Sequence, residues 1–544
     1  MHVELKTQKY TDFFQAIVDH PSFKDKKDSD FHDVYRSAKN ALDNTSYHSR
    51  NECNISIETD NKNLVTALLE LSKEHDVRPL TLRLNPFNNY YAQGLKSKIV
   101  NIEVLKKAFV DAFIKNKKDV NGNGWIFVNE NNVCLPYAVC DVAIKTDREN
   151  NRWLELSTQF IDTEDRRIEE SEHLSSVESR NFIIRDTDVS GKSFSEVLDG
   201  LRIIFESAEL LEEYQFFNKK FQEYTKMGHA VFMNNSELTY RSHYEDYRVK
   251  PCTKMVSEEG LFIRKICDSI ESDFFEERIP LPTHPILILF SLADLHHLSS
   301  HVKFIDPYAF KRELKDKLIL PEEHKDMIDI LTSELETLND IIDGKSGGTS
   351  IICTGSPGLG KTLTAEVYSE VVGRPLYRVN ASTLGLDGES IEKNLEIIFT
   401  RSMRWNAVAL IDEADIYIRR RTDDMNHNAV VASFLRKMEY FDGLMFMTTN
   451  RGDDVDDAIM SRCIAHIKYE TPSAVSAKRI WKMLSTEFKH PLSDSLIDQL
   501  VVSFPKNSGR DIKELLKLTI RYCDSKKKAI DHDSFVKMST FRGM

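Results

Sequence analysis

The 544-residue sequence predicts an α/β fold for its C-terminal part, with a parallel sheet flanked by helices, and an α+β fold for the region before it. A short apolar strand at 349–354 leads directly into a glycine-rich loop and then into a helix. Strand-like and helix-like segments alternate after this loop, which is typical of a parallel sheet. The last segment, 476–544, has apolar residues at helical spacing and predicts a helical domain.

The first 115 residues predict a mainly helical region. Apolar residues recur at helical spacing between 64 and 71, after Asp60 as a candidate cap, and again between 105 and 113. These segments would form amphipathic helices.

The region 116–310 predicts an α+β module. A strand is expected at 125–128, and the segments 142–145 and 153–156 flank a polar run that suits a hairpin turn. A long amphipathic helix is expected over 201–224. The large α/β domain would then occupy 311–475.

Composition excludes several classes of protein. The hydrophobic share of 41% is that of a folded chain, not a disordered one, and the formal net charge of −13 argues against a protein that coats nucleic acid. A local basic channel for nucleic acid stays open. No apolar segment follows Met1, and the most apolar stretch, 285–293, is too short to cross a bilayer. Eight scattered cysteines without a CxxC pair predict reduced thiols, so we expect a cytoplasmic protein without membrane contact.

The glycine-rich loop matches the pattern GxxxxGK[ST], whose chemistry is phosphate binding. Glycines allow backbone N–H groups to curl around a phosphate, and the positive end of the following helix points at the anion. Lys361 would reach the β- and γ-phosphates, and the Thr362 hydroxyl would bind Mg²⁺. The predicted nucleotide-binding residues here are Gly355, Ser356, Pro357, Gly358, Leu359, Gly360, Lys361, Thr362 and Leu363.

Two later strands end in polar residues that suit the same site. An apolar strand at 408–411 leads into Asp412 and Glu413, and another at 444–449 ends at Asn450. The carboxyl ends of parallel strands form the ligand-binding edge of a sheet. We expect Asp412 to hold Mg²⁺ through water, Glu413 to polarise the attacking water, and Asn450 to hydrogen-bond the γ-phosphate or that water. The letters Asp-Glu-Ala-Asp also occur in RNA helicases, but no further helicase motif is evident.

In this order the motifs resemble the AAA family of AAA+ ATPases over about 311–544. The matching segments are Walker A at 355–362, Walker B at 410–415, sensor 1 at 448–451, the arginine-finger segment at 457–463 and sensor 2 at 508–512. Residues 375–377, 434–436 and 439–440 are similar to long members with a divergent N-terminal region. The resemblance implies a P-loop AAA+ module with a helical lid at 476–544, which uses ATP and Mg²⁺.

The resemblance also implies a ring, usually a hexamer, with active sites between subunits. Arg462 would project into the neighbouring subunit's site to stabilise charge on the γ-phosphoryl group, and Arg510 would contact phosphates from the lid. The implied catalytic residues are Lys361, Glu413, Asn450 and Arg462, with Mg²⁺ held by Thr362 and Asp412. The second arginine that is common in this family is missing, because the chain continues as Ile-Ala-His-Ile at 464–467.

Two segments have more than one interpretation. Many family members grip an extended polymer with an aromatic pore-loop residue, but Leu386 stands at that position and Asp387 follows it. Leucine lacks the broad ring face of an aromatic residue, so threading is not implied. The arginines at 419–421 could line a pore, sense nucleotide at an interface, or form a solvated helix face.

The leading interpretation is an oligomeric ATPase that couples hydrolysis to remodelling of a macromolecule, which residues 1–310 would recognise. One alternative is a nucleotide-dependent assembly switch or scaffold that recruits an effector, as in some defence systems, and Leu386 favours it. A second alternative is a clamp-loader-like ATPase on DNA, suggested by Ser461-Arg462-Cys463 and disfavoured by the acidic net charge.

Overall fold

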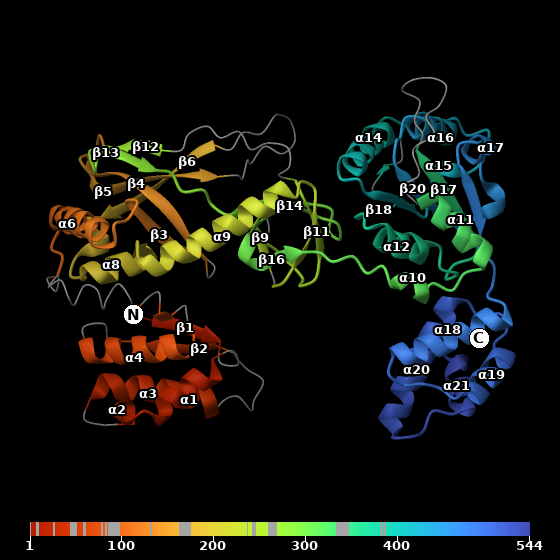
Figure 1. Cartoon of the computed structure of the whole chain (residues 1–544), viewed down its shortest axis with the longest axis horizontal. Helices are drawn as coiled ribbons and strands as arrows, with labels where there is room; N and C mark the ends of the chain where they lie inside the picture. Colours follow the sequence, from red (N-terminus) through yellow and green to blue (C-terminus); the bar gives the residue numbers. More distant parts are fainter. Residues whose placement is uncertain are drawn as a thin grey trace. The chain divides into compact units, whose positions relative to one another are not determined.

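The computed structural model divides the chain into two compact units (Figure 1). The first comprises Met1–Gly228, Glu258–Leu289 and Leu298–Ile305, and the second comprises His229–Ser257, Phe290–His297 and Asp306–Met544. The structure describes residues 2–6, 10–24, 28–43, 52–57, 61–77, 80–81, 84, 98–130, 133–162, 176–236, 238–241, 246–258, 269–332, 348–380, 384–385 and 388–543.

The first unit begins with a small α/β region that has its own apolar core. Its elements are β1 (His2–Lys6), α1 (Thr11–Asp19), α2 (Pro21–Lys24), α3 (Ser29–Asp43), β2 (Glu52–Ser56) and α4 (Lys62–Glu74). The helix expected at 64–71 is confirmed as α4. Its cap is Asn61, whose side chain accepts a hydrogen bond from the Leu64 backbone N–H at 3.2 Å, so the expected cap at Asp60 is wrong by one position. Asp60 itself lies outside the described residues.

The main sheet of the first unit is antiparallel, in the order β6-β5-β4-β3-β7. Its strands and the accompanying helices are α6 (Ile102–Val120), β3 (Trp125–Glu130), β4 (Val133–Thr146), β5 (Arg152–Asp162), β6 (Ser176–Arg185), α7 (Asp186–Val189), α8 (Phe194–Gly200), β7 (Ile203–Phe205) and α9 (Ala208–Lys226). The strand expected at 125–128 and the expected hairpin are confirmed, and Lys145 of β4 lies opposite Trp153 of β5.

The long helix expected over 201–224 begins later than predicted. Ile203 and Ile204 are buried in β7, which pairs with β3 at the edge of the sheet. Ser207 then caps α9 by accepting a hydrogen bond from the Leu210 N–H at 3.3 Å. Burial in the sheet outweighs the helical spacing of these apolar residues, because tertiary packing overrides local propensity.

Short strands follow between 231 and 307. They are β8 (Val231–Asn234), β9 (Leu238–Arg241), β10 (Asp246–Val249), β11 (Lys254–Ser257), β12 (Ser269–Ser272), β13 (Glu277–Pro280), β14 (Ile286–Ser291), β15 (His297–His301) and β16 (Ile305–Pro307), with the 3-10 turn η3 (Val302–Phe304). In the second unit β8 pairs antiparallel with β11. The segments 229–257 and 290–297 belong to the same compact unit as the C-terminal domains, so a boundary at 310 stays a prediction.

The second unit is built on a five-stranded sheet in the order β18-β19-β20-β17-β21. The strands are β17 (Thr349–Thr354), β18 (Leu376–Asn380), β19 (Val408–Asp412), β20 (Leu444–Thr449) and β21 (Ala465–Lys468), and every pair is parallel. β19 and β20 are buried along their whole length, as expected for the central strands of a sheet covered on both faces. The predicted α/β fold with a parallel sheet is therefore confirmed.

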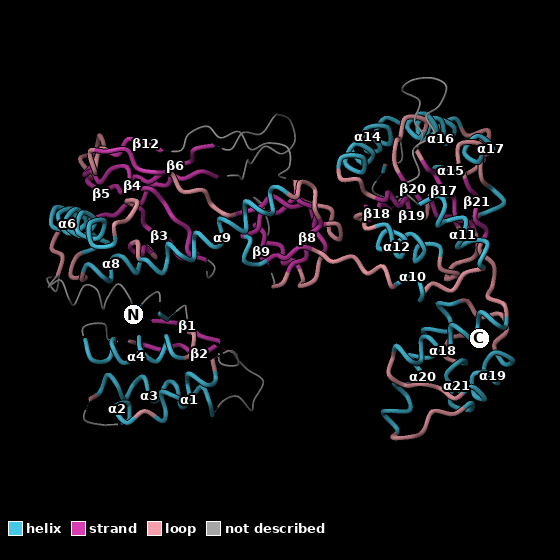
Figure 2. The backbone as a smooth tube through the Cα atoms, in the orientation of Figure 1, coloured by secondary structure: helices cyan, strands magenta, loops and turns pink. Residues whose placement is uncertain are grey.

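Helices cover both faces of this sheet (Figure 2). On one face, α14 (Gly388–Arg404) and α16 (Met425–Met438) share a core with Val379, Ile411 and Met447. On the other, α11 (Glu322–Thr332) and α12 (Lys361–Val372) share a core with Ile351, Leu410 and Phe446. The shorter elements are α10 (Leu314–Lys317), α15 (Asp415–Ile418), η4 (Gly452–Asp454) and α17 (Asp457–Met460).

Four helices close the chain: α18 (Ala474–Glu487), α19 (Asp494–Ser503), α20 (Gly509–Lys526) and α21 (His532–Thr540). They pack around a separate apolar core, in which Trp481 of α18 lies edge-on against Phe535 of α21 with ring centroids 5.4 Å apart. The expected helical C-terminal domain is thus present. None of the helices in the described ranges is long and apolar enough to cross a membrane.

Trp481→Ala should loosen this helical domain. Trp481 is 1% exposed, and loss of a buried aromatic side chain costs about 3–5 kcal/mol. Hydrogen–deuterium exchange of the full chain should show faster exchange across α18–α21, whereas Val502→Ala, at a residue that is 80% exposed, should leave exchange unchanged. Equal protection in the two variants would contradict the assigned core.

Candidate active site

The loop between β17 and α12 is shaped by three glycines with positive φ. The angles are 141° at Gly355, 82° at Gly358 and 101° at Gly360, in the region that side chains rarely adopt. At Gly355, a Cβ atom would lie 2.4 Å from the carbonyl oxygen of Tyr469, so only glycine fits there. The helix that follows begins at Lys361, and its free N–H groups attract an anion.

The Lys361 side chain turns back onto the glycine-rich loop. Its ammonium donates hydrogen bonds to the carbonyl oxygens of Gly355 at 2.7 Å and Ser356 at 2.9 Å, and to Oδ1 of Asn450 at 2.9 Å. Burial lowers the pKa of Lys361, while the nearby carboxylates Asp412 and Asp415 act in the opposite direction. The predicted residues Lys361 and Asn450 are therefore brought together.

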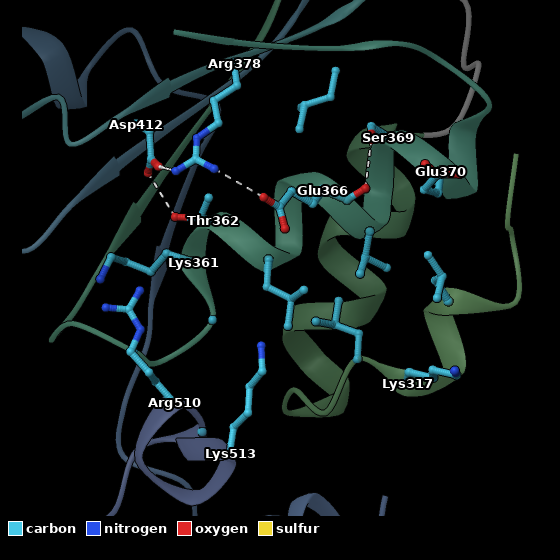
Figure 3. Close-up of a pocket in the computed structure, with 18 of the residues that line it drawn as sticks. Lys317, Lys361, Thr362, Glu366, Ser369, Glu370, Arg378, Asp412, Arg510 and Lys513 are labelled. Carbon is cyan, nitrogen blue, oxygen red and sulfur yellow. Dashed lines mark hydrogen bonds and ion pairs between the residues drawn. The ribbon is translucent and has the colours of Figure 1, made fainter. Parts of the chain in front are cut away.

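Asp412, the last residue of β19, has donors on both carboxylate oxygens. Oδ1 accepts hydrogen bonds from the Thr362 hydroxyl at 2.9 Å and the Thr448 hydroxyl at 2.5 Å. Oδ2 accepts one from Nη2 of Arg378 at 2.6 Å (Figure 3). Thr362 and Asp412, both predicted to hold Mg²⁺, thus lie side by side and offer the oxygen ligands that this ion prefers. A search of the described residues for three clustered His, Cys, Asp or Glu side chains finds none, so a metal here would need further ligands from nucleotide and water.

Glu413 has an unusual backbone conformation, with φ at 55°. A non-glycine residue in this region costs of order 1–3 kcal/mol and persists only when its surroundings hold it there. The Glu413 N–H donates to the Thr448 hydroxyl at 3.1 Å, so one threonine fixes both acidic residues. Glu413 lines the same cavity as Lys361 and Thr362.

The cavity has a volume of about 1420 Å³. Besides the loop, with its predicted residue Leu359, and the strand ends, it is lined by an apolar group that the sequence analysis did not identify: Leu318, Ile319, Leu320, Ile480, Met483 and Leu484. These side chains suit the faces of a purine ring, because ligand pockets are mainly apolar with a few placed polar groups.

Arg510 and Lys513 enter the cavity from the first turns of α20, toward the loop (Figure 3). The Arg510 backbone N–H donates to the carbonyl oxygen of Gly358 at 3.2 Å, which fixes the helix start against the loop. Within the described part of the chain, neither the Arg510 guanidinium nor the Lys513 ammonium has a hydrogen bond or ion pair. Both are available to phosphate; the sequence analysis predicted Arg510 and missed Lys513.

Arg462 is placed differently from the other predicted residues. It is absent from the described residues that line the cavity. Its Nη1 donates to the carbonyl oxygen of Ala458 at 3.2 Å, and its Nη2 lies 3.4 Å from Oε2 of Glu439. The half-exposed guanidinium therefore does not reach its own chain's Lys361 site.

The three arginines after α15 are each paired with an aspartate before or in α17. Arg419 lies 3.2 Å from Asp454 and Arg421 lies 3.0 Å from the buried Asp456, while Arg420 and Asp457 are 3.5 Å apart. The predicted helix face at 419–421 is wrong, because α15 ends at Ile418 and the three arginines follow it outside any helix. Pore lining and nucleotide sensing stay predictions for a segment whose charges are balanced within the chain.

The profile of the family described as "ATPase family associated with various cellular activities (AAA)" matches residues 351–471. The chain contains an AAA-family ATPase domain. This match spans the loop, Asp412, Asn450 and Arg462 of the site described above. It confirms the family resemblance that the motifs predicted.

Curated relatives support the same assignment. The "ATPase family AAA domain-containing protein FIGL1" of Arabidopsis thaliana is 30% identical over 193 residues, which are 33% of this chain and 28% of that protein. The "Outer mitochondrial transmembrane helix translocase" of Homo sapiens is 27% identical over 225 residues, which are 39% of this chain and 58% of that protein. The chain thus matches less than two thirds of the length of either relative.

Among solved structures, a chain in "Structure of E. coli MS115-1 HORMA:CdnC:Trip13 complex" is similar at 18% identity and a TM-score of 0.35. The alignment covers 42% of this chain and 91% of that chain. A TM-score of this size does not extend the assignment beyond the AAA domain.

Thr448→Val should impair hydrolysis without removing nucleotide binding. The substitution keeps the shape of the side chain but removes the hydroxyl that joins Asp412 to the Glu413 backbone. Loss of such a support typically costs tenfold to a hundredfold, so we expect kcat for ATP to fall by about tenfold or more. Thr519→Val, which removes an equally buried hydroxyl bonded to the Leu515 carbonyl oxygen, should leave kcat unchanged. An unchanged kcat in Thr448→Val would contradict this role.

Proposed function

We propose that the AAA domain of this chain binds and hydrolyses ATP. The observation that carries the proposal is the convergence of Lys361, Thr362 and Asp412 on one cavity, which Glu413 and Asn450 also line. A glycine-rich loop alone indicates only phosphate binding, whereas this set also contains a metal-holding pair and a candidate base.

The geometry supports a role for each group. The apolar lining around Ile319 and Met483 would hold the base, and Lys361 would exchange its carbonyl partners for phosphate oxygens. Thr362 and Asp412 would hold Mg²⁺, which neutralises charge on the phosphates. Glu413 would accept the proton of the attacking water, and Asn450 would orient that water or the γ-phosphate.

Two substitutions test this proposal. Lys361→Ala should abolish ATP binding, because the main cation of the loop is lost. Retained tight binding would show that the loop is not part of the ATP site.

Glu413→Gln should keep ATP binding but reduce hydrolysis by about a hundredfold or more, because general-base catalysis is lost. Normal turnover in Glu413→Gln would exclude it as the base. Equilibrium binding of a fluorescent ATP analogue and steady-state phosphate release provide the two measurements.

We further propose that the active form is an oligomer, with a ring of six as the expected arrangement. Arg462 supports this, because it lies outside its own chain's cavity and is half-exposed beside Glu439. In a ring it would leave Glu439 for the more highly charged phosphate of the neighbouring subunit. The family resemblance also implies a ring with active sites between subunits, which agrees with this placement.

A mixing experiment tests the shared site. Arg462→Ala and Glu413→Gln should each be inactive alone, but co-assembly should restore activity at about a quarter of the sites in a randomly mixed ring. A mixture of Lys361→Ala with Glu413→Gln is the matched control and should stay inactive, because neither chain has an intact site of its own. No recovery in demonstrated mixed oligomers would exclude an arginine finger in trans.

The task coupled to hydrolysis is, in our proposal, remodelling of a protein recognised by residues 1–310. A relative named for translocating a transmembrane helix supports a polypeptide as the substrate class. Turnover stimulated by an unfolded protein would favour this function. Slow turnover with ATP-driven assembly would favour the switch or scaffold, and salt-sensitive stimulation by DNA would favour the clamp-loader-like ATPase. Leu386, on which threading depends, lies outside the described residues, and cytoplasmic localisation stays a prediction.

A further inference from the structure

Arg378 contacts the proposed ATP site, but the proposed chemistry assigns this residue no role. It lies on β18, where Tyr377 and Val379 point into the core and Arg378 alternates to the opposite side. Its Nη2 donates to Oδ2 of Asp412 at 2.6 Å, and the Asp412 side chain is only 6% exposed. Arg378 therefore neutralises the carboxylate that is expected to serve Mg²⁺.

A guanidinium at this distance competes with a cation for the same carboxylate. Oδ1 of Asp412 already accepts two hydroxyl hydrogen bonds, and Oδ2 is taken by Arg378. A divalent ion held by Asp412 and Thr362 would lie close to the positive charge of Arg378, which is unfavourable in a partly buried site. The stronger the Arg378–Asp412 pair is, the more weakly Asp412 can support a metal.

Glu366 offers Arg378 a second partner. It lies on α12, one turn after Thr362, and its Oε1 is 3.5 Å from Nη1 of Arg378. The two carboxylates therefore flank one guanidinium, with the short bond to Asp412 and the long one to Glu366 (Figure 3). The Arg378 side chain is 47% exposed, so packing leaves it room to turn toward Glu366.

We propose that Arg378 is a positioning residue that holds Asp412 in the metal-free site and must shift toward Glu366 before Asp412 can serve Mg²⁺. The inference rests on the proposed ATP site. In this arrangement Arg378 sets the concentration of free Mg²⁺ at which Asp412 can serve the ion. Nucleotide that binds without Mg²⁺ therefore does not complete the metal site.

The test measures nucleotide binding as a function of free Mg²⁺. A fluorescent ADP analogue is titrated with full-length protein at a series of EDTA-buffered Mg²⁺ concentrations, and the Mg²⁺ midpoint of binding is compared between variants. Arg378→Gln, which removes the charge, should lower the midpoint by about tenfold, because a charge-assisted bond to a half-exposed arginine is lost. Arg378→Lys keeps a positive charge and should restore a midpoint near that of the wild type. Glu366→Gln should raise the midpoint, because the second partner is weakened.

Arg436→Ala is the matched control, since it breaks another half-exposed arginine–glutamate pair, with Glu392, and should leave the midpoint unchanged. Circular dichroism confirms that each variant folds. A midpoint in Arg378→Gln that is unchanged or higher, with normal binding by the wild type, would overturn the inference and leave the proposed function intact. A wild type that binds no nucleotide at any Mg²⁺ concentration would overturn both.

Discussion

A carboxylate at the end of a buried strand is the constraint on which the rest of the site depends. β19 is buried along its whole length and ends in Asp412, so the charge of Asp412 is unfavourable unless hydrogen-bond donors surround it. The three donors come from three different elements: Thr362 from α12, Thr448 from β20 and Arg378 from β18. Satisfying this one charge joins the loop helix, the end of β20 and the middle of β18 at one carboxylate.

The sheet order explains why the remaining groups meet at the same place. β20 lies between β17 and β19, so residues at its carboxyl end can reach in both directions. Asn450 reaches Lys361 on one side, and Thr448 reaches Asp412 on the other. Lys361 shows the complementary problem, because its buried positive charge is met mainly by neutral carbonyl oxygens. An anionic phosphate is a stronger partner for it than these carbonyls, which explains how the loop can bind a phosphate group.

Motif residues could be predicted from the sequence because their spacing reflects local structure. The loop, the acidic residues after 408–411 and Asn450 each lie at the end of one strand, and the parallel sheet brings those ends together. Arg378 could not be assigned in the same way, because its role depends on pairing between β18 and β19. Glu439 and the apolar lining around Met483 likewise come from distant segments with no recognisable spacing. In the first unit, spacing alone predicted a helix through Ile203 and Ile204, where pairing with β3 prevailed.

The arrangement around Arg462 limits how this residue can move. The segment before α17 is joined to the segment after α15 by backbone hydrogen bonds as well as ion pairs. The Arg420 N–H donates to the Asp454 carbonyl oxygen at 2.9 Å, and the Asp456 N–H donates to the Ile418 carbonyl oxygen at 2.8 Å. Asp456 also caps α17 and accepts from Arg421, and its hydrogen bond to Arg421 helps to lower the pKa of Asp456 against the effect of burial. The start of α17 is thus anchored to the segment that follows α15. In the proposed ring, the freedom of Arg462 would lie mainly in its own side chain. Exchange of its present partners for a phosphate would cost one half-exposed ion pair with Glu439 and one hydrogen bond to the Ala458 carbonyl oxygen, and would leave the backbone of α17 in place.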